Sequence, residues 1–351
     1  MRLSPVVVLA LVMTLGSGLR LEAQAGEQAL YEPALAKFQA GDVEGALAEI
    51  AKVEKRLPKD GIARYYRGVF LEKKGDSVAA EKAYRAAIDL APDLPEARSN
   101  LCALRIVAGE HGEAISLCEK AVALRPDFTD AWHNLGIACQ GAGRDKDAVR
   151  AFEKVVAMAP SKADAWMNLG ALRLRGGDKD KALASLAEAA RLAPRDYLAR
   201  FNYGAALAAT GRLDKAAVEL EEATRLNPRH APAFSRLGSV LRRLGHGDAA
   251  VAAHEAGKKL LPNDAAAALE LGLSHAARAG EGDALAAAAE LTRAEKLAKA
   301  AWEPPYYLGL LHARAGRCSE ARAAMERYRQ RDKKERMANE VRAALAGCQG
   351  K

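Results

Sequence analysis

Aromatic residues are scarce in this chain of 351 residues, where phenylalanine, tryptophan and tyrosine together make up 5%. This scarcity argues against a single large globule filled by aromatic side chains. Small residues, alanine above all, suit closely packed helices instead. Half of the residues are hydrophobic, which argues against general disorder. A chain of this length usually divides into domains or forms a linear stack of repeated units.

Motifs for enzymatic chemistry are also missing. The five cysteines show no zinc-type spacing, and the sequence has no glycine-rich phosphate loop, nucleophile elbow or paired-histidine motif. Six of the seven histidines fall at helix-packing positions or in loops and at helix ends: His254, His275 and His312, then His111, His230 and His246. We therefore expect no catalytic residue, no metal and no cofactor.

Charge of one sign is not concentrated in long runs, although the formal net charge is +8. This modest excess does not predict a nucleic-acid partner. The basic stretch from Arg327 to Arg336 contains acids and indicates a solvated helix, and the alternative is a membrane-surface or nucleic-acid patch. Membrane contact is therefore expected only at the periphery.

The longest apolar run near the start, Pro5 to Leu15, is shorter than the about 20 residues that span a bilayer. A small-x-small pattern, Ala23-Gln24-Ala25, precedes Gly26. This layout predicts that residues 1–25 are a secretory signal peptide and that the protein is periplasmic or secreted. Arg20, close to the cleavage site, leaves an uncleaved N-terminal anchor as the alternative.

Three residue types recur in steps of 34 residues. The glycines are Gly41, Gly75, Gly109, Gly143, Gly177, Gly211 and Gly245. The prolines are Pro58, Pro92, Pro126, Pro160, Pro194, Pro228 and Pro262. The alanines are Ala46, Ala80, Ala114, Ala148, Ala182, Ala216, Ala250 and Ala284. Chance does not keep three residue types in phase over seven repeats.

Residues 129–162 show what one repeat encodes. From Trp132, apolar or small residues follow at i+3, i+4 and i+7, which is one face of a helix. Gly143 ends that helix in the left-handed cap conformation, and a second helix runs from Asp145 to just before Pro160. Neither short helix can bury its apolar stripe alone, so each pair must stack on the next and an all-α solenoid is predicted.

The motifs at 132–136 (Trp-His-Asn-Leu-Gly) and 166–170 (Trp-Met-Asn-Leu-Gly), followed by glycine, alanine and proline at fixed offsets, resemble the tetratricopeptide repeat family. The resemblance covers residues 27 to about 333 and implies a right-handed superhelical solenoid of helix-turn-helix repeats. Nine repeats are expected: 27–60, 61–94, 95–128, 129–162, 163–196, 197–230, 231–264, 265–301 and 302–333.

Two departures from the period are visible. The spacing from Gly272 to Gly309 is three residues too long, and we expect a lengthened second helix over Ala284–Ala300 in the eighth repeat. Residues 334–351 are expected to form a capping helix, about Lys334 to Ala346, and a tail, because a terminal repeat must cover its apolar face.

The resemblance implies that first helices line a concave face, to which the residue before each Leu-Gly pair points. This residue is Asn100, Asn134, Asn168 and Asn202 in successive repeats, then Arg236. The row resembles the asparagine ladder in the repeats of O-linked N-acetylglucosamine transferase. Amides both donate and accept hydrogen bonds, so the row can hold an extended peptide by its backbone. In the alternative, each asparagine binds a neighbouring helix.

Next to this row lie His133, Met167 and Phe201, which would add an apolar strip. Arginines at other groove-type positions are Arg175, Arg236, Arg242, Arg243 and Arg314. Arginine forks suit carboxylates, so an acidic peptide or an acidic C-terminus is the expected partner. Alternatively, Arg242 and Arg243 form a solvated helix end.

Two cysteine pairs are disulfide candidates in an oxidising compartment. Cys318 and Cys348 begin and follow antiparallel helices and come to the same end of the last repeat. Cys102 and Cys118 flank Gly109 at similar height on paired helices, although Cys102 can also be a core residue.

The sequence thus predicts a non-catalytic scaffold that binds a peptide or partner protein in its groove. One alternative is a regulatory or targeting subunit of a separately encoded enzyme, such as a glycosyltransferase. The other is a membrane-peripheral structural scaffold.

Overall fold

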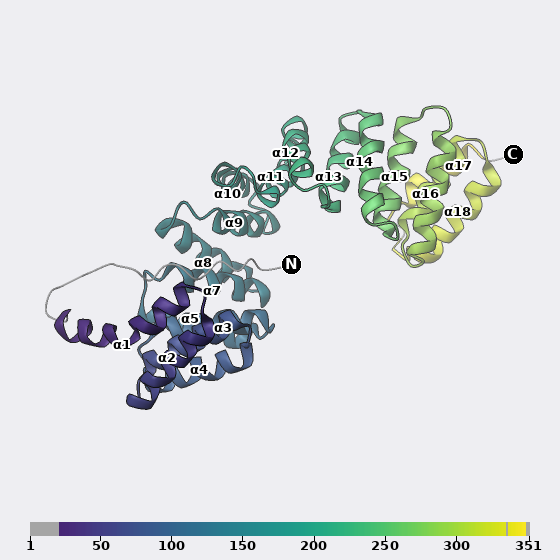
Figure 1. Ribbon diagram of the computed structural model, residues 1–351. Helices are drawn as coiled ribbons and strands as arrows, with labels where there is room; N and C mark the ends of the chain where they lie inside the picture. Colours follow the sequence, from purple (N-terminus) through teal and green to yellow (C-terminus); the bar gives the residue numbers. More distant parts are fainter. Residues whose placement is uncertain (1–20, 335, 349–351) are drawn as a thin grey trace. The chain divides into compact units, whose positions relative to one another are not determined.

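The structure is a computed structural model that describes residues 21–334 and 336–348 (Figure 1). Within these ranges the chain forms nineteen helices and no strand. The predicted leader, residues 1–25, lies outside the described residues except for its last five, which begin helix α1. The chain divides into two compact units, unit 1 up to Asp147 and unit 2 from Ala148, and each is described by itself.

Unit 1 is a stack of helix pairs, α1 with α2, α3 with α4 and α5 with α6, and α7 packs on α5 and α6. Each second helix also packs on the first helix of the next pair, so the pairs form a continuous stack. The helices of unit 1 are α1 (Leu21–Gln39), α2 (Val43–Arg56), α3 (Gly61–Lys74), α4 (Ser77–Leu90), α5 (Pro95–Val107), α6 (His111–Leu124) and α7 (Thr129–Gly141).

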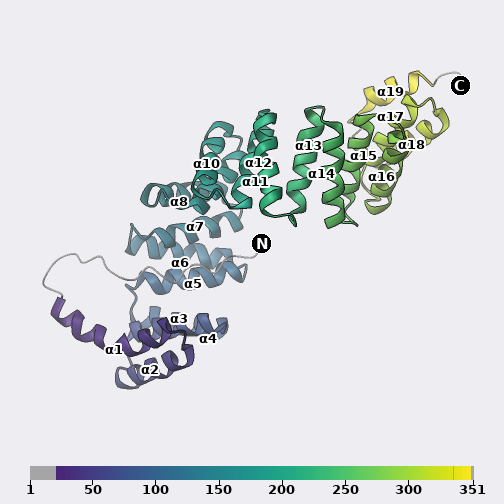
Figure 2. The same cartoon turned by 45° about the horizontal axis from the view of Figure 1, so that its top comes forward.

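Unit 2 repeats the same pairing, and the chain enters it within the first turn of α8 (Asp145–Met158). Figure 2 shows the pairs α13 with α14 and α15 with α16 side by side. The other helices are α9 (Ala163–Arg175), α10 (Lys179–Leu192), α11 (Tyr197–Ala209), α12 (Leu213–Leu226), α13 (Ala231–Arg243), α14 (Gly247–Leu260), α15 (Ala265–Arg278), α16 (Asp283–Leu297), α17 (Glu303–Arg314), α18 (Cys318–Arg331) and α19 (Ala338–Ala346). Both units have the all-α solenoid architecture that the sequence predicts.

The periodic glycines form the corner between the two helices of a repeat. Gly75 has φ +89°, its N–H donates to the Glu72 carbonyl, and the N–H of Asp76 donates to the Leu71 carbonyl. These bonds satisfy carbonyls at the end of α3, and only a residue without Cβ adopts this φ cheaply. All seven glycines of the 34-residue series have positive φ, which confirms their predicted role.

A second glycine series lets the two helices of a repeat approach closely. A Cβ on Gly170 of α9 would lie 2.5 Å from Cγ of Leu186 on α10, so the leucine packs directly on the glycine backbone. The same pairing occurs at Gly68 with Tyr84, Gly204 with Leu220, Gly238 with His254, Gly272 with Leu291 and Gly309 with Met325. In the third repeat Cys102 and Cys118 stand at these two positions and are joined as a disulfide.

The eighth repeat departs from the period in its corner, so the predicted long helix over Ala284–Ala300 is wrong. Helix α16 ends at Leu297, and Ala287 rather than Ala284 is the buried alanine of this repeat. The three extra residues therefore lie before Ala287, where Ala279 has φ +53° and Gly282 has φ +79°.

Asp283 holds this longer corner together. Its buried carboxylate accepts hydrogen bonds from Arg278 Nε (2.9 Å) and from the backbone N–H of Gly280 (2.6 Å), and it contacts His275 Nδ1 (3.0 Å). An ionised carboxylate with several donors is well satisfied although it is buried.

The C-terminal helix α19 begins at Ala338, four residues later than the predicted start at Lys334. The reason is a turn built on Asp332, which accepts hydrogen bonds from the Tyr328 hydroxyl and the Arg336 backbone N–H, both at 2.8 Å. Helix α19 then places Val341 on the apolar face of the ninth repeat. A disulfide joins Cys318, at the start of α18, to Cys348, two residues after α19.

Candidate functional site

The predicted peptide-binding residues are the positions before each Leu-Gly pair, here called the ladder positions. In unit 1, Asn100 lies half-buried on α5, and its Nδ2 donates to the Tyr84 hydroxyl on α4 at 3.2 Å. That hydroxyl donates in turn to Glu72 Oε2 on α3 at 2.8 Å. Burial raises the pKa of the Glu72 carboxyl, and the hydrogen bond from Tyr84 opposes this effect. The amide N–H of Asn100 therefore ties two repeats together.

Asn134 on α7 has a similar role in unit 1. Its Nδ2 lies 3.3 Å from the Ser99 carbonyl and 3.4 Å from the Ser99 hydroxyl, both on α5. The neighbouring His133 is half-buried. The N–H groups of both asparagines of unit 1 thus bind neighbouring helices, as in the alternative interpretation of the ladder.

The two asparagines of unit 2 differ from those of unit 1. Asn168 on α9 and Asn202 on α11 are half-buried, and neither side chain hydrogen-bonds to another residue in the described part of the chain. Helices α9 and α11 pack against each other, so the two amides belong to adjoining first helices. Both amides are available to a ligand that can donate and accept hydrogen bonds.

The apolar strip next to these amides is part of the core. Met167 and Phe201 are half-buried and pack on the cluster that includes Leu186 and Leu220. The Phe201 ring also meets the His230 ring edge-on, with 4.9 Å between centroids. These side chains support the ladder positions of unit 2 and leave only part of their surface open.

The predicted arginines are exposed at Arg175, Arg236, Arg243 and Arg314, and Arg242 is half-buried. Arg242 donates to Glu270 Oε2 on α15 at 3.2 Å, and Arg243 donates to the Ala208 carbonyl in the last turn of α11 at 3.1 Å. A cation at a helix C-terminus is stabilised by the helix dipole, so Arg243 has a structural role there.

The sequence prediction did not name all of the ladder positions. The repeat spacing also places Tyr66 in the second repeat, Glu270 in the eighth and Tyr307 in the ninth at the same position as the asparagines. Counting the period in both directions would have found them. Glu270 matters most, because it brings a carboxylate to the end of the row where a basic surface is predicted.

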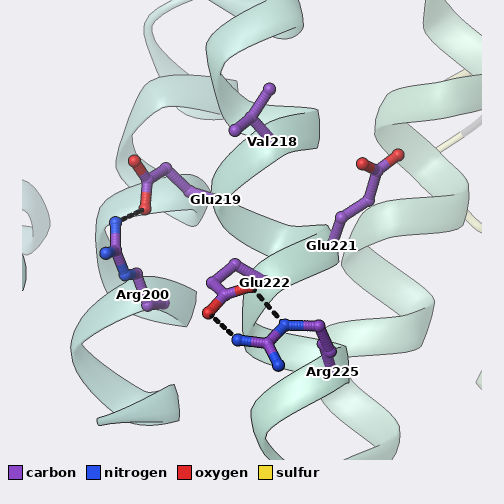
Figure 3. A pocket seen from close by; sticks show the side chains of 6 residues that line it. All are labelled: Arg200, Val218, Glu219, Glu221, Glu222 and Arg225. Atoms are coloured by element: carbon purple, nitrogen blue, oxygen red, sulfur yellow. Dashed lines mark hydrogen bonds and ion pairs between the residues drawn. The ribbon is translucent and has the colours of Figure 1, made fainter. Parts of the chain in front are cut away.

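The structure also has a pocket of about 440 Å³ in the sixth repeat, away from the ladder positions. Figure 3 shows its charged side chains in two ion pairs, Arg200 with Glu219 and Arg225 with Glu222, with Glu221 apart from both. The pocket is lined by Arg200, Val218, Glu219, Glu221, Glu222 and Arg225.

Arg200 stands where the fourth and fifth repeats carry tryptophan. The indole Nε1–H groups of Trp132 and Trp166 each donate to the carbonyl of a proline six residues earlier, at 2.8 Å. Arg200 Nε makes the corresponding bond to the Pro194 carbonyl at 3.2 Å. The slimmer guanidinium keeps the bond but not the bulk of the indole, which accounts for the hollow. Both arginines of the pocket are paired with glutamates, so no set of donors is left to bind a ligand, and no ligand is evident for this pocket.

In residues 21–334 and 336–348, no three or more histidine, cysteine, aspartate or glutamate side chains converge as a metal site would require. No helix in that part of the chain is both long and apolar enough to cross a bilayer.

Comparison with known proteins places the repeats in a family. The tetratricopeptide repeat model matches residues 31–95, 133–194 and 172–231. No curated protein matches the sequence.

Among solved structures, the Cut9-Hcn1 hetero-tetramer of APC/C is 18% identical with a TM-score of 0.55, over 85% of this chain and 59% of that one. The pilF protein of Pseudomonas aeruginosa is 17% identical with a TM-score of 0.53, over 58% and 93%. A tetratricopeptide repeat protein from Parabacteroides merdae is 17% identical with a TM-score of 0.51, over 68% and 93%.

At these identities the similarity shows the fold alone. The matched residues carry the glycine, alanine and proline series described above, and the helices pair as those series require. The repeats over residues 31–95 and 133–231 belong to the tetratricopeptide repeat family.

Proposed function

We propose that the protein is a non-catalytic scaffold that holds an extended segment of a partner protein against Asn168 and Asn202. The observation that supports this proposal is the contrast between the two units. Asn100 and Asn134 bind neighbouring helices, whereas Asn168 and Asn202 are not used by the stack. An extended peptide offers N–H and C=O groups that pair with such amides whatever its side chains are.

The chemistry of the partner follows from the charge that lies next to these asparagines in the row of first helices. Arg236 is exposed at the ladder position of α13, the first helix after α11. A peptide with an acidic side chain near the asparagines would pair with this guanidinium group. We therefore propose an acidic extended peptide as the preferred ligand.

We further propose that the protein works in the periplasm or outside the cell. The signal-peptide pattern of residues 1–25 supports export. The two disulfides support the same proposal, because such bonds persist in an oxidising compartment. Expression of the full chain in a bacterial host tests this: recovery from the periplasm with Gly26 as first residue supports export, and retention in the cytoplasm with Met1 intact contradicts it.

Binding can be tested without knowing the partner. Peptides selected from a random phage-displayed library on the full chain would be measured against wild type and N168A/N202A. We expect acidic peptides to bind wild type and to lose at least about tenfold in affinity to the variant, because each amide contributes paired hydrogen bonds. The variant should keep its melting temperature, since neither amide supports the stack.

The matched control is N263A, which removes an exposed asparagine from the loop after α14. Its affinity should equal that of wild type. Selected peptides that bind N168A/N202A as tightly as wild type would show that these amides are not the binding surface.

A further inference from the structure

His254 takes the place of a hydrocarbon side chain in the seventh repeat. The corresponding residues are Leu186, Leu220 and Leu291 in the fifth, sixth and eighth repeats, each packed on a glycine of the paired helix. The His254 ring packs on Gly238 in the same way, so closely that a Cβ there would lie 2.6 Å from it. Only 2% of His254 is exposed. A titratable ring thus replaces an apolar one at a packing site.

The hydrogen bonds around this ring fit its neutral form. Nε2 lies 3.1 Å from the Ser235 carbonyl on α13, which only accepts, so the proton of neutral His254 is on Nε2. Nδ1 lies 2.8 Å from the Ser274 hydroxyl on α15, which can donate to it. His254 therefore bridges both helices that pack on α14.

Two charged groups face the ring, one from each helix packed on α14. Glu270 Oε2 on α15 lies 3.8 Å from Nε2, and Arg242 on α13 donates to the same oxygen at 3.2 Å. The Ser239 hydroxyl also reaches this oxygen, at 3.1 Å. Burial lowers the pKa of His254, with Glu270 acting against this effect and Arg242 adding to it.

We propose that His254 makes the packing of α13, α14 and α15 sensitive to pH, tight while the ring is neutral and weaker once it is protonated. Protonation would place a second cation beside Arg242, at a site that the neighbouring repeats fill with leucine. Glu270 already accepts hydrogen bonds from Arg242 and Ser239, so it would have to be shared between two cations. Protonation therefore places a charged ring at a packing site and weakens the ion pair between α13 and α15.

The direction of the pH effect follows from proton linkage. Unfolded histidine titrates near pH 6.5, and the folded pKa of His254 lies below that value. The unfolded segment therefore binds more protons than the folded one as the pH falls through 6.5. Stability at this junction is fully present above that pH and decreases below it. The proposal does not depend on whether the ladder positions bind a peptide.

Hydrogen exchange of the full chain at pH 7.5, 6.5 and 5.5, corrected for intrinsic rates, tests the proposal. In wild type, amide protection in α13–α15 should fall between pH 7.5 and 5.5 by up to about tenfold relative to α9–α12. H254L, which copies the residue of neighbouring repeats, should abolish this excess. The proposal would be overturned if H254L lost as much protection in α13–α15 as wild type, or if wild type lost no more protection in α13–α15 than in α9–α12.

A second measurement applies if H254L does not fold. The assigned ring resonances of His254 in wild type, followed by NMR, give its protonation midpoint directly. A midpoint below pH 6.5 with shifts of the Ser235 and Ser274 amides supports the proposal. A midpoint at or above 6.5 contradicts it, because protonation would then not oppose folding.

Discussion

Cys102 on α5 and Cys118 on α6 are bonded to each other at the two repeat positions where six other repeats pack a large side chain on a glycine. The equivalent pair in the fifth repeat is Gly170 with Leu186. The same space between two helices is therefore filled by a disulfide in one repeat and by a large side chain packed on a glycine in the others. This equivalence allows the bond to be replaced by residues that the chain already uses.

We expect C102G/C118L to fold without the disulfide. The cross-link closes a loop with a sequence separation of 16 residues, for which the chain-entropy account gives about 3 kcal/mol. A buried leucine recovers roughly 1.5–3 kcal/mol of this loss, whereas the polar pair in C102S/C118S recovers little. Hydrogen exchange of α5 and α6 should therefore rank wild type first, C102G/C118L second and C102S/C118S last. If amides of α5 and α6 were equally protected in the two variants, the glycine–leucine pair would not replace the disulfide.

Thiol counting gives an independent check of both bridges. Cys102–Cys118 and Cys318–Cys348 leave only the buried thiol of Cys139. Denatured, non-reduced protein should therefore react at one cysteine, and reduced protein at five. Three reactive cysteines without reductant would mean that one bridge is missing, and five would remove both.

The features that the sequence predicts best are those with a local cause. Gly75 must adopt a positive φ where α3 ends, and the residue before Pro92 cannot continue a helix, whatever surrounds them. The 34-residue period therefore predicts the corners and the pairing of helices. The period does not predict the corner of the eighth repeat, because the place of its extra residues depends on which groups the Asp283 carboxylate contacts in the folded chain.

The candidate site was predicted less completely, because its residues differ in their neighbours and not in their type. Asn100 and Asn168 occupy the same repeat position, but only Asn100 meets a tyrosine hydroxyl, that of Tyr84. The residue that corresponds to Tyr84 in the repeat before Asn168 is Phe152 of the fourth repeat, which has no hydroxyl. Side-chain contacts between repeats thus decide which amides are open, and these contacts follow from the folded stack.

Loss of the C-terminal bridge should loosen α19 alone. C348S removes a cross-link with a sequence separation of 30 residues, worth roughly 3–4 kcal/mol in the chain-entropy account. The Asp332 turn does not involve either cysteine, so α18 should keep its protection. Exchange in residues 338–346 should accelerate while α9–α14 stay unchanged, as measured by mass spectrometry. Unaltered exchange in α19 would show that Val341 and its apolar contacts suffice to hold it.

The corner at Asp283 should respond to acid in a different pH range from His254. The Arg278 guanidinium, then the contacts with His275 and Gly280, holds the pKa of the Asp283 carboxyl far below its usual value. A carboxyl with a depressed folded pKa stabilises the fold above its unfolded pKa of about 3.9, and this contribution is lost as the pH falls below that value. D283N should lose about 1–3 kcal/mol at neutral pH, because buried donors are left without the charge.

The control for this variant is D248N. Asp248 also pairs with Arg278, at 3.0 Å, but its side chain is 95% exposed. An exposed ion pair contributes roughly 0–1 kcal/mol, so D248N should unfold close to wild type. Thermal unfolding of the three proteins at pH 7 separates the two aspartates. A similar loss in D248N would place the stabilisation in the arginine pair rather than in the corner.

The tryptophan position of the repeat gives the last prediction. R200W should fill the pocket of the sixth repeat and donate its indole N–H to the Pro194 carbonyl, as Trp132 and Trp166 do to their prolines. The ion pair that Arg200 forms with Glu219 would be lost, but the apolar surface that the indole covers is worth about 25 cal/mol per Å² and should offset it. The melting temperature should therefore equal or exceed that of wild type. R200A, which loses the bond and leaves the hollow, should melt lower than both. If R200W melted below R200A, the indole would not fit the hollow, and the hollow would not be a packing defect.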